Sequence, residues 1–332
     1  MMKQARFVRS LLLSMAGAAL LALTNAAQAA EKVTVRLDFT PGGHHVAMHL
    51  AKEKGWFARE GLEVDVQDGA GTLHTIQLVA ADQVEIGQVI LGGMAMALEK
   101  KLPIKSFAGF MRVGDMAVIV PRDSGINTLA DLKGKKLLCF TGSPWMSFID
   151  NFLAKGGLDR KSVNVTMVAP PAMMSLYSAK EADGIMSFET FVIPLMEKTR
   201  PSKAIRTADY GIVFPSYGLI ASNKTLADRK DMLRKITRVQ TETWEYIQKG
   251  NVDEAVQALI KQRPGVKLDP GVIKGQVELN LTLVPTAATK GKRIGWQASA
   301  DWAAAIKSMK DAGAITGNPK PEDYYTNEFV PN

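Results

Sequence analysis

The feature that most constrains the fold is a repeated order of short apolar strand, glycine-rich loop and amphipathic helix. The run Val33–Leu37 alternates apolar and polar residues, and a Gly/Pro loop then leads into a helix that ends near Gly61. A second strand, Leu62–Val66, is followed by the loop Gly69–Thr72 and another apolar helix. This order predicts an α/β fold with largely parallel sheets.

The same order returns in the middle of the chain. The turn that follows the apolar strand Met116–Val120 indicates a first crossing into a second α/β unit, and the strand Tyr217–Ser222 indicates the return. The remainder reads as helices. We therefore expect lobe 1 to comprise residues 30–120 plus 217–332, and lobe 2 to comprise residues 121–216.

The first 29 residues are predicted to be a secretory signal peptide. Three basic residues, Lys3, Arg6 and Arg9, precede the apolar run Leu11–Leu23, and Ala27–Ala29 has the small-x-small pattern of a cleavage site. The apolar run is short for a membrane span. We expect an exported, periplasmic protein.

Charge and cysteine content narrow the possible functions. The full chain has a formal charge of +8, and removal of the three basic residues of the signal peptide, with no acidic residue, leaves +5. The basic residues are scattered, which gives no support for nucleic-acid binding. Cys139 is the single cysteine and lies in an apolar run, so we expect a buried thiol and no intramolecular disulfide.

Short motifs along the mature chain carry a family resemblance. The opening loop and helix resemble those of solute-binding proteins related to the thiamine-pyrimidine synthases, within the superfamily of sulfonate- and nitrate-binding components of ABC importers. The connector Ile126–Gly134 and the ending Tyr325–Phe329 are also similar. The matching residues of the opening are Leu37, Asp38, Phe39, His45, Ala51, Gly55, Trp56, Phe57, Glu60, Gly61 and Leu62.

The resemblance implies a two-lobed periplasmic binding protein of type II, each lobe a mixed, largely parallel sheet flanked by helices. Such proteins close about a hinge and trap a small molecule between the lobes. The implied partners are a small-molecule ligand and an ABC permease of the inner membrane. We expect a monomer without a cofactor.

Three residues of lobe 1 are candidate ligand contacts, because they follow a strand and open a helix. Asp38 can accept hydrogen bonds from ligand N–H groups, Phe39 offers a flat face for stacking, and His45 can donate or accept. The alternative is structural: Asp38 caps the local backbone and Phe39 belongs to the core.

Lobe 2 offers a second set of candidates. Gly142, Ser143 and Trp145 lie where a strand passes into a helix, so Ser143 can anchor a polar group and Trp145 can stack on a ring. Ordinary helix capping and packing are the alternatives. Glu189 ends another strand, and the resemblance implies that a glutamate in this region binds the nitrogens of a pyrimidine.

Metal binding is not expected. His45, His49 and Glu53 fall on one face of a helix, but they lack the His-Glu-x-x-His order of metalloproteases.

An enzyme is not expected either. The resemblance raises a single-turnover pyrimidine synthase, but Val89 and Gly93 occupy the places of its lysine and histidine, and its cysteine-rich motif is absent.

The sequence thus predicts the substrate-binding component of an ABC importer for a small heteroaromatic molecule, such as a thiamine pyrimidine precursor. Two carboxylates on opposite lobes would suit a ring rich in N–H donors and repel a bare anion. Alkanesulfonate, taurine, nitrate and an aromatic carboxylate are the alternative ligands. A binding module of a sensor system is the alternative role.

Overall fold

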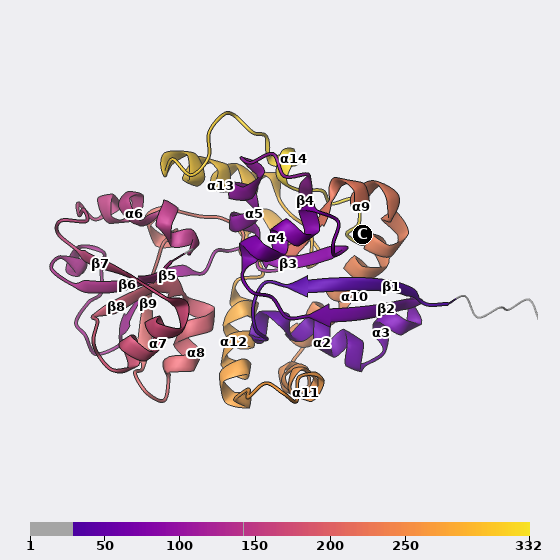
Figure 1. Ribbon diagram of the computed structural model, residues 1–332, viewed down its shortest axis with the longest axis horizontal. Coiled ribbons are helices and arrows are strands. Elements are labelled where there is room, and N and C mark those ends of the chain that lie inside the picture. The colour runs from indigo at the N-terminus through magenta and orange to yellow at the C-terminus, as the bar shows by residue number, and fades with distance from the viewer. Residues whose placement is uncertain (1–28, 142) are drawn as a thin grey trace, which may run out of the picture.

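The chain forms two α/β lobes side by side in the computed structural model, which describes residues 29–141 and 143–332 (Figure 1). Each lobe is built on a five-stranded sheet flanked by helices. The predicted two-lobed α/β architecture is therefore confirmed. The predicted signal peptide lies outside the described residues, which begin at position 29.

The sheet of lobe 1 has the strand order β2-β1-β3-β10-β4. β1 pairs in parallel with β2 and β3, whereas β10 runs antiparallel to both β3 and β4. The strands are β1 (Glu31–Leu37), β2 (Leu62–Gln67), β3 (Ile86–Ile90), β4 (Ile104–Gly109) and β10 (Tyr217–Ser222).

The sheet of lobe 2 has the order β7-β6-β8-β5-β9 and repeats this mixture. β6 pairs in parallel with β7 and β8, and β5 runs antiparallel to β8 and β9. The strands are β5 (Met116–Pro121), β6 (Lys136–Phe140), β7 (Asn164–Val168), β8 (Gly184–Phe188) and β9 (Ser202–Arg206).

The position of β5 corrects the predicted lobe boundary. Met116–Val120 was predicted to lie in lobe 1, but β5 is hydrogen-bonded between β8 and β9, so the chain crosses at residues 110–115. An apolar strand does not reveal its partners, and the polar turn after Pro121 was mistaken for the crossing. Tyr217 begins β10 in the first sheet, where the return was expected.

Helices cover the sheets and make up most of the last third of the chain, as predicted. The α-helices are α2 (Val46–Glu53), α3 (Trp56–Arg59), α4 (Thr72–Ala80), α5 (Leu91–Leu98), α6 (Ile149–Lys155), α7 (Pro170–Ser178), α8 (Glu189–Met196), α9 (Asn223–Asp228), α10 (Lys230–Gln248), α11 (Val252–Gln262), α12 (Pro270–Thr282), α13 (Ser299–Asp311) and α14 (Pro321–Tyr324). Short 3₁₀ helices are η1 (Gly43–His45), η2 (Ala130–Leu132), η3 (Pro144–Ser147), η4 (Ala208–Tyr210) and η5 (Ala287–Thr289).

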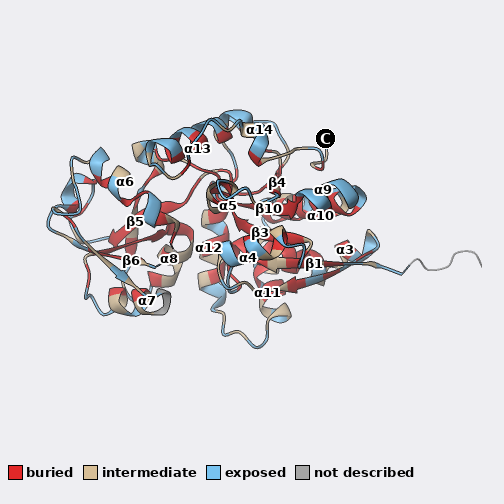
Figure 2. Cartoon of the chain, turned by 45° about the horizontal axis from the view of Figure 1, so that its top comes forward, coloured by how far each residue is buried: buried red, intermediate tan, exposed pale blue. Residues whose placement is uncertain are grey.

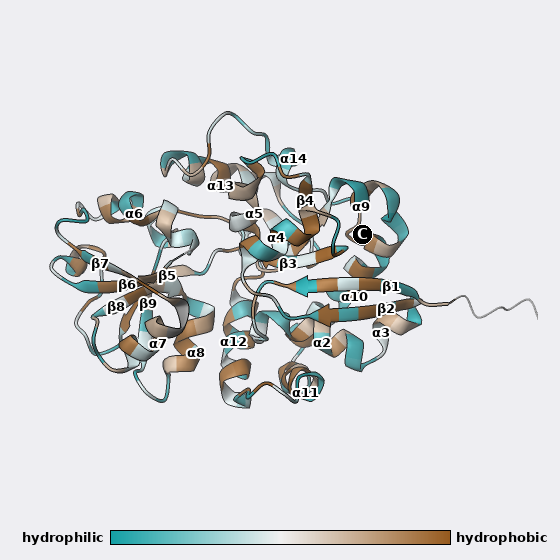
Figure 3. Ribbon diagram, viewed as in Figure 1, coloured by the Kyte–Doolittle hydropathy of each residue, from teal (hydrophilic) through white to brown (hydrophobic). Residues whose placement is uncertain are grey.

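The buried residues follow the sheets and the inner faces of these helices (Figure 2). The strands carry most of the apolar residues, and polar residues gather on the outer helix faces (Figure 3). Leu37, Leu50 and Trp244 are almost completely buried in lobe 1, and Cys139 is buried in lobe 2 as expected. Within residues 29–141 and 143–332, no helix combines the length and the apolar character needed to cross a membrane.

The carboxyl ends of the parallel strands lie, in both lobes, at the end of the sheet where the crossings attach. In lobe 1, Ile90 at the end of β3 pairs with Tyr217, the first residue after the second crossing. In lobe 2, Phe188 at the end of β8 pairs with Met116, the first residue after the first crossing. The arrowheads of β1 and β2 accordingly point toward lobe 2 (Figure 1).

Helix α12 stands between the lobes (Figure 1). It packs against α8 of lobe 2 and against η1 and α11 of lobe 1. The structure therefore has a third interlobe connection besides the two crossings.

Candidate functional site

Asp38, the residue that follows β1, is the centre of a buried hydrogen-bond network. Its Oδ1 lies 3.0 Å from Nε2 of His45, its Oδ2 accepts a 3.0 Å bond from the hydroxyl of Thr72, and the Tyr217 side chain interacts electrostatically with the carboxylate. Only 3% of Asp38 is exposed. Burial by itself would raise the pKa of Asp38, but the interactions of its carboxylate with His44 and His45 outweigh burial and hold that pKa well below its usual range.

The hydrogen bonds of His45 indicate one neutral tautomer. Its Nδ1 accepts a 3.2 Å bond from the backbone N–H of Gly42, so Nε2 carries the proton and donates to Asp38. Burial lowers the pKa of His45 to about 4, despite the opposing effect of Asp38. The side chain is fully buried and both nitrogens are occupied. His45 thus holds the loop after β1 in place, and its contact with a ligand stays a prediction.

His44 and Tyr217 complete this network and were missed in the sequence. Their rings stack with centroids 4.0 Å apart, and Nε2 of His44 lies 3.6 Å from Oδ1 of Asp38. In the part of the chain that the structure describes, this Nε2 has no hydrogen-bond partner, and His44 is 6% exposed. Tyr217 carries no local signal of this role, because it lies far from Asp38 in the sequence.

Asp38, His44 and His45 have ligand atoms within 4.8 Å of one another, close enough to be considered for a metal ion. A metal-bound histidine normally donates a hydrogen bond through its other nitrogen. Here Nδ1 of His45 accepts one instead, from Gly42. The cluster is therefore better suited to a hydrogen-bond network than to a metal ion.

The histidine face considered in the sequence does not form a site. His49 is buried, and neither of its ring nitrogens has a hydrogen-bond partner among the described residues, whereas Glu53 bonds to Lys261 and Gln262 on α11.

Phe39 is the predicted contact residue with the most accessible side chain, at 43% exposed. The loop around it is held by the N–H of Gly69, which donates to the Phe39 carbonyl at 3.0 Å. A side chain at Gly69 would collide with the backbone of Leu37 and Asp38, so this loop packing requires glycine. Leu73 in lobe 1 and Met146 in lobe 2 are also exposed apolar residues in the segments that follow these strand ends.

Ser143 and Trp145 have structural roles in lobe 2. The hydroxyl of Ser143 caps η3 by accepting a 3.3 Å bond from the Trp145 N–H. The Trp145 indole is fully buried, packs edge-on against Phe152, and donates to the carbonyl of Ser187 at 3.0 Å. These are the alternatives that the sequence left open. Ligand contact through Ser143 or Trp145 stays a prediction, and Gly142 lies outside the described residues.

Glu189 begins α8 and is 2% exposed. Its two carboxylate oxygens lie 2.7 and 2.9 Å from Nε of Arg206, which is the last residue of β9. Burial raises the pKa of Glu189, and the bond to Arg206 opposes that rise. The predicted acceptor of ligand N–H groups is thus already paired with a cation in this structure, and its contact with a ligand stays a prediction.

Asp115 joins the crossings to α8. It is fully buried, and its carboxylate accepts bonds from the hydroxyls of Thr190 at 2.6 Å and Ser216 at 2.9 Å. Its carbonyl accepts from the N–H of Glu189 at 2.9 Å. Burial raises the pKa of Asp115.

Gln276 on α12 connects the two lobes directly. Its Oε1 accepts a 2.8 Å bond from the N–H of Gly43 in lobe 1, and its Nε2 donates to the carbonyl of Phe191 in lobe 2 at 3.3 Å. A buried amide that serves both lobes ties the position of α8 to that of the loop after β1.

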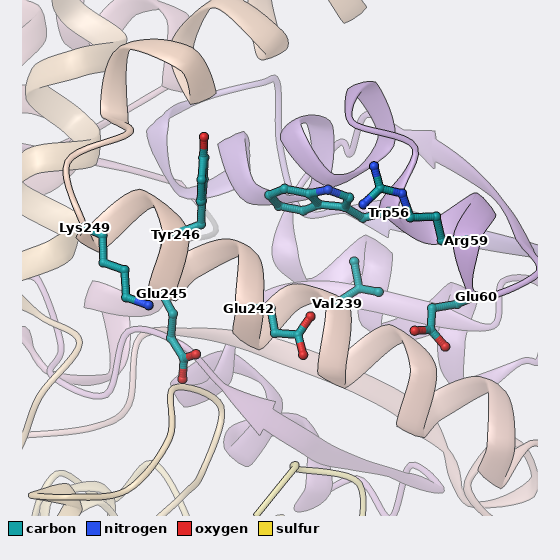
Figure 4. Close-up of a pocket in the computed structure, with 8 residues that line it drawn as sticks. All are labelled: Trp56, Arg59, Glu60, Val239, Glu242, Glu245, Tyr246 and Lys249. Atoms are coloured by element: carbon teal, nitrogen blue, oxygen red, sulfur yellow. The ribbon is translucent and has the colours of Figure 1, made fainter.

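Two surface pockets among the described residues lie away from the strand ends that carry the predicted ligand contacts. A pocket of about 330 Å³ is formed by α3 and α10 near the amino-terminal ends of β1 and β2, with Trp56 and Tyr246 among its walls (Figure 4). Another, of about 670 Å³, is lined by Pro121, Lys135 and other residues at the far end of lobe 2. Neither includes Asp38, Phe39 or Glu189.

Comparisons with known proteins agree with the fold and with the family resemblance. A Haemophilus influenzae protein named for thiamine biosynthesis is 27% identical over 248 residues, which cover 74% of this chain and 77% of that protein. A formylaminopyrimidine-binding protein from Halalkalibacterium halodurans is 25% identical over 238 residues, which cover 70% of this chain and 71% of the relative.

Solved structures share the architecture at much lower identity. The alkanesulfonate-binding protein SsuA from Xanthomonas axonopodis pv. citri, bound to MOPS, superimposes with a TM-score of 0.64 at 12% identity, covering 89% of this chain and 98% of that one. At this identity the likeness concerns the fold alone, and it confirms the predicted periplasmic-binding-protein architecture.

The family model described as "NMT1/THI5 like" matches residues 43–252, more than half of the chain. The match includes the helix that follows Asp38, both crossings and the whole of lobe 2. It agrees with the resemblance found in the opening and closing motifs. The protein therefore belongs to the NMT1/THI5-like family.

Proposed function

We propose that the protein is the substrate-binding component of an ABC importer and that it captures a small nitrogen-rich ring, such as a thiamine pyrimidine precursor, between its lobes. One observation carries the proposal. The carboxyl ends of the parallel strands of both sheets lie where the crossings attach, and Phe39 is exposed at that end of lobe 1. Ligands of open α/β sheets bind at such strand ends.

The chemistry of the surrounding side chains supports a ring with N–H donors. A phenyl face such as that of Phe39 favours a flat partner. Asp38, which precedes Phe39 in the chain, and Glu189 in lobe 2 bring two carboxyl groups to these strand ends, which disfavours a small bare anion. A relative named for binding formylaminopyrimidine supports the same ligand class.

Capture rather than catalysis is the proposed role. The relatives include a named binding protein, and the lysine, histidine and cysteine-rich motif of the synthases are absent from the corresponding places of this sequence. With the predicted signal peptide, this supports a periplasmic protein that delivers its ligand to an inner-membrane permease. We propose that it acts as a monomer.

A thermal-shift screen of the purified mature protein tests the proposal. Aminopyrimidines, flavins, polyamines, alkanesulfonates, nitrate and aromatic carboxylates are compared at equal concentration. A ligand at a hundredfold excess over its dissociation constant stabilises the native state by about 2.7 kcal/mol. We expect this rise for aminopyrimidines and recovery of the ligand unchanged. A rise with sulfonates, nitrate or aromatic acids only would contradict the ring assignment, and chemical conversion of the ligand would contradict the binding role.

A further inference from the structure

The ion pair between Arg206 and Glu189 joins a buried carboxylate to an exposed guanidinium. Glu189 is 2% exposed, whereas the side chain of Arg206 is 47% exposed. The arginine reaches the carboxylate through Nε alone, at 2.7 and 2.9 Å from the two oxygens. A carboxylate that is removed from water is stable only when it is well paired. The buried Glu189 therefore holds Nε of Arg206 against it, and this fixes the direction of the guanidinium.

The terminal amino groups of Arg206 remain available. Neither makes a hydrogen bond to residues 29–141 or 143–332, while Nε is committed to Glu189. A guanidinium has five N–H donors in a planar fork, and its two terminal nitrogens can hold one oxygen-bearing group with two parallel bonds. Arg206 thus presents a fixed pair of donors to its surroundings.

The place of this fork in the fold connects it with the proposed ligand site. Arg206 pairs with Ala117 in β5, next to the pairing of Met116 with Phe188 at the carboxyl end of β8. Arg206 is therefore at the end of the lobe 2 sheet where both crossings attach, the same end at which Glu189 begins α8. The acidic residues Glu189 and Asp209 lie near it, and Asp115 lies near Glu189.

The surrounding charges indicate what the fork can hold. Glu189 offsets the charge of Arg206, and Asp209 adds a further negative charge nearby. Because these charges nearly cancel, the site attracts a free small anion only weakly. It favours an acceptor oxygen that is attached to a larger ligand, since the remainder of that ligand supplies other contacts.

We infer that Arg206, oriented by Glu189, is a specificity-determining residue that holds a carbonyl or carboxylate oxygen on a side group of the ring ligand. This inference rests on the proposed function, because it takes the ring to be bound between the lobes. It adds that a substituent with an acceptor oxygen is part of what the protein recognises.

Calorimetric titration with two matched probes tests the inference. One is an aminomethyl-aminopyrimidine, and the other is the same molecule with a formyl group on the aminomethyl nitrogen. A third probe carries a carboxylate in place of the formyl group. We expect wild type to prefer the two oxygen-bearing probes, and Arg206→Gln to bind these about ten- to a hundredfold more weakly while binding the plain amine unchanged.

The variants include matched controls. Arg122→Gln removes an exposed arginine that pairs with Glu197 at the opposite end of the same lobe, and it should leave all three affinities unchanged. Because Arg206→Gln leaves the buried carboxylate of Glu189 without its cation, the double variant with Glu189→Gln is measured in parallel. It should fold, and compared with Glu189→Gln alone it should show the same selective loss for the two oxygen-bearing probes.

The outcomes separate the two proposals. Arg206→Gln is compared with wild type, and the double variant is compared with Glu189→Gln. If wild type binds the probes and either comparison shows all three affinities unchanged or all three lost equally, Arg206 does not recognise the oxygen, although the proposed function stands. If wild type binds none of the three, the proposed pyrimidine ligand and the role of Arg206 both fail.

Discussion

The carboxylate of Asp38 lies 3.0 Å from Nε2 of His45, and this contact organises the loop that opens the first helix. Nδ1 of His45 accepts the N–H of Gly42, so the proton lies on Nε2 and the imidazole is neutral. The two residues predicted to contact a ligand are therefore also each other's partners. Their shared role in the loop yields predictions that do not require the ligand.

Asp38→Asn should destabilise the protein by about 1.5–3 kcal/mol at neutral pH, because an amide replaces a carboxylate that accepts several hydrogen bonds. The pKa of Asp38 lies well below its usual value in the native state, so its contribution is present above an unfolded pKa of about 3.9 and is lost as the pH falls below that. Urea unfolding at pH 7 and pH 3 measures this. Asp65→Asn, at an exposed position of β2, is the control and should change little.

His49→Leu should stabilise the protein, increasingly so in acid. Burial lowers the pKa of His49 to about 3, and neither ring nitrogen has a hydrogen-bond partner within residues 29–141 and 143–332. The unfolded chain binds a proton below about pH 6.5 and the native chain only near pH 3, so wild type loses up to about 1.4 kcal/mol per pH unit in that window. The difference in melting temperature between variant and wild type should grow from pH 7 to pH 4. A melting-temperature difference that stays constant or shrinks over this pH range would contradict the prediction. His74→Leu, at an exposed position, serves as the comparison.

Gln276→Leu should weaken the connection between the lobes. The variant leaves the N–H of Gly43 and the carbonyl of Phe191 without partners, a loss of about 1–3 kcal/mol for a buried group. Amide exchange at Gly43 should accelerate, and the unfolding midpoint should fall. Gln262→Leu removes a bond to Glu53 within lobe 1 and should leave exchange at Gly43 unchanged. Equal exchange in both variants would refute the interlobe role.

Phe39→Ala should weaken ligand binding while changing the free energy of unfolding only slightly. At 43% exposed, the ring contributes little to the core, so we expect a loss of less than about 1 kcal/mol in unfolding free energy. Loss of the stacking face should weaken binding of an aminopyrimidine by about tenfold. Met167→Ala removes another exposed apolar side chain, on β7, and should leave affinity intact. Unchanged affinity in Phe39→Ala would exclude it from the site.

The sequence allowed the architecture and part of the site to be predicted. Periodicity and glycine-rich loops identify strands such as β1 and β2, because one buried face leaves an alternating pattern. The same pattern does not indicate which strands pair with one another, so the apolar strand β5 was assigned to the wrong lobe. The short strands β4 and β9 were missed for want of a clear alternating pattern.

The candidate site shows the same limit in its side chains. Asp38, Phe39 and His45 lie within eight residues of one another in the sequence and were recognised together. Thr72 and Tyr217 reach Asp38 only through the fold, and Arg206 reaches Glu189 across β5. Long-range partners of this kind decide whether a carboxylate is available to a ligand, and a local motif does not contain them. The clue to Arg206 was slight: an arginine that ends a short run between two proline- or glycine-containing turns.

A crystal structure of the mature protein with a bound aminopyrimidine tests the central claim most directly. We predict the ring between the lobes, with its centroid roughly 4.5–7 Å from that of Phe39 and with lobe 2 side chains from the strand ends on its other side. A ring bound instead in the outer pocket beside Trp56 and Tyr246, or contacts confined to one lobe, would contradict the account.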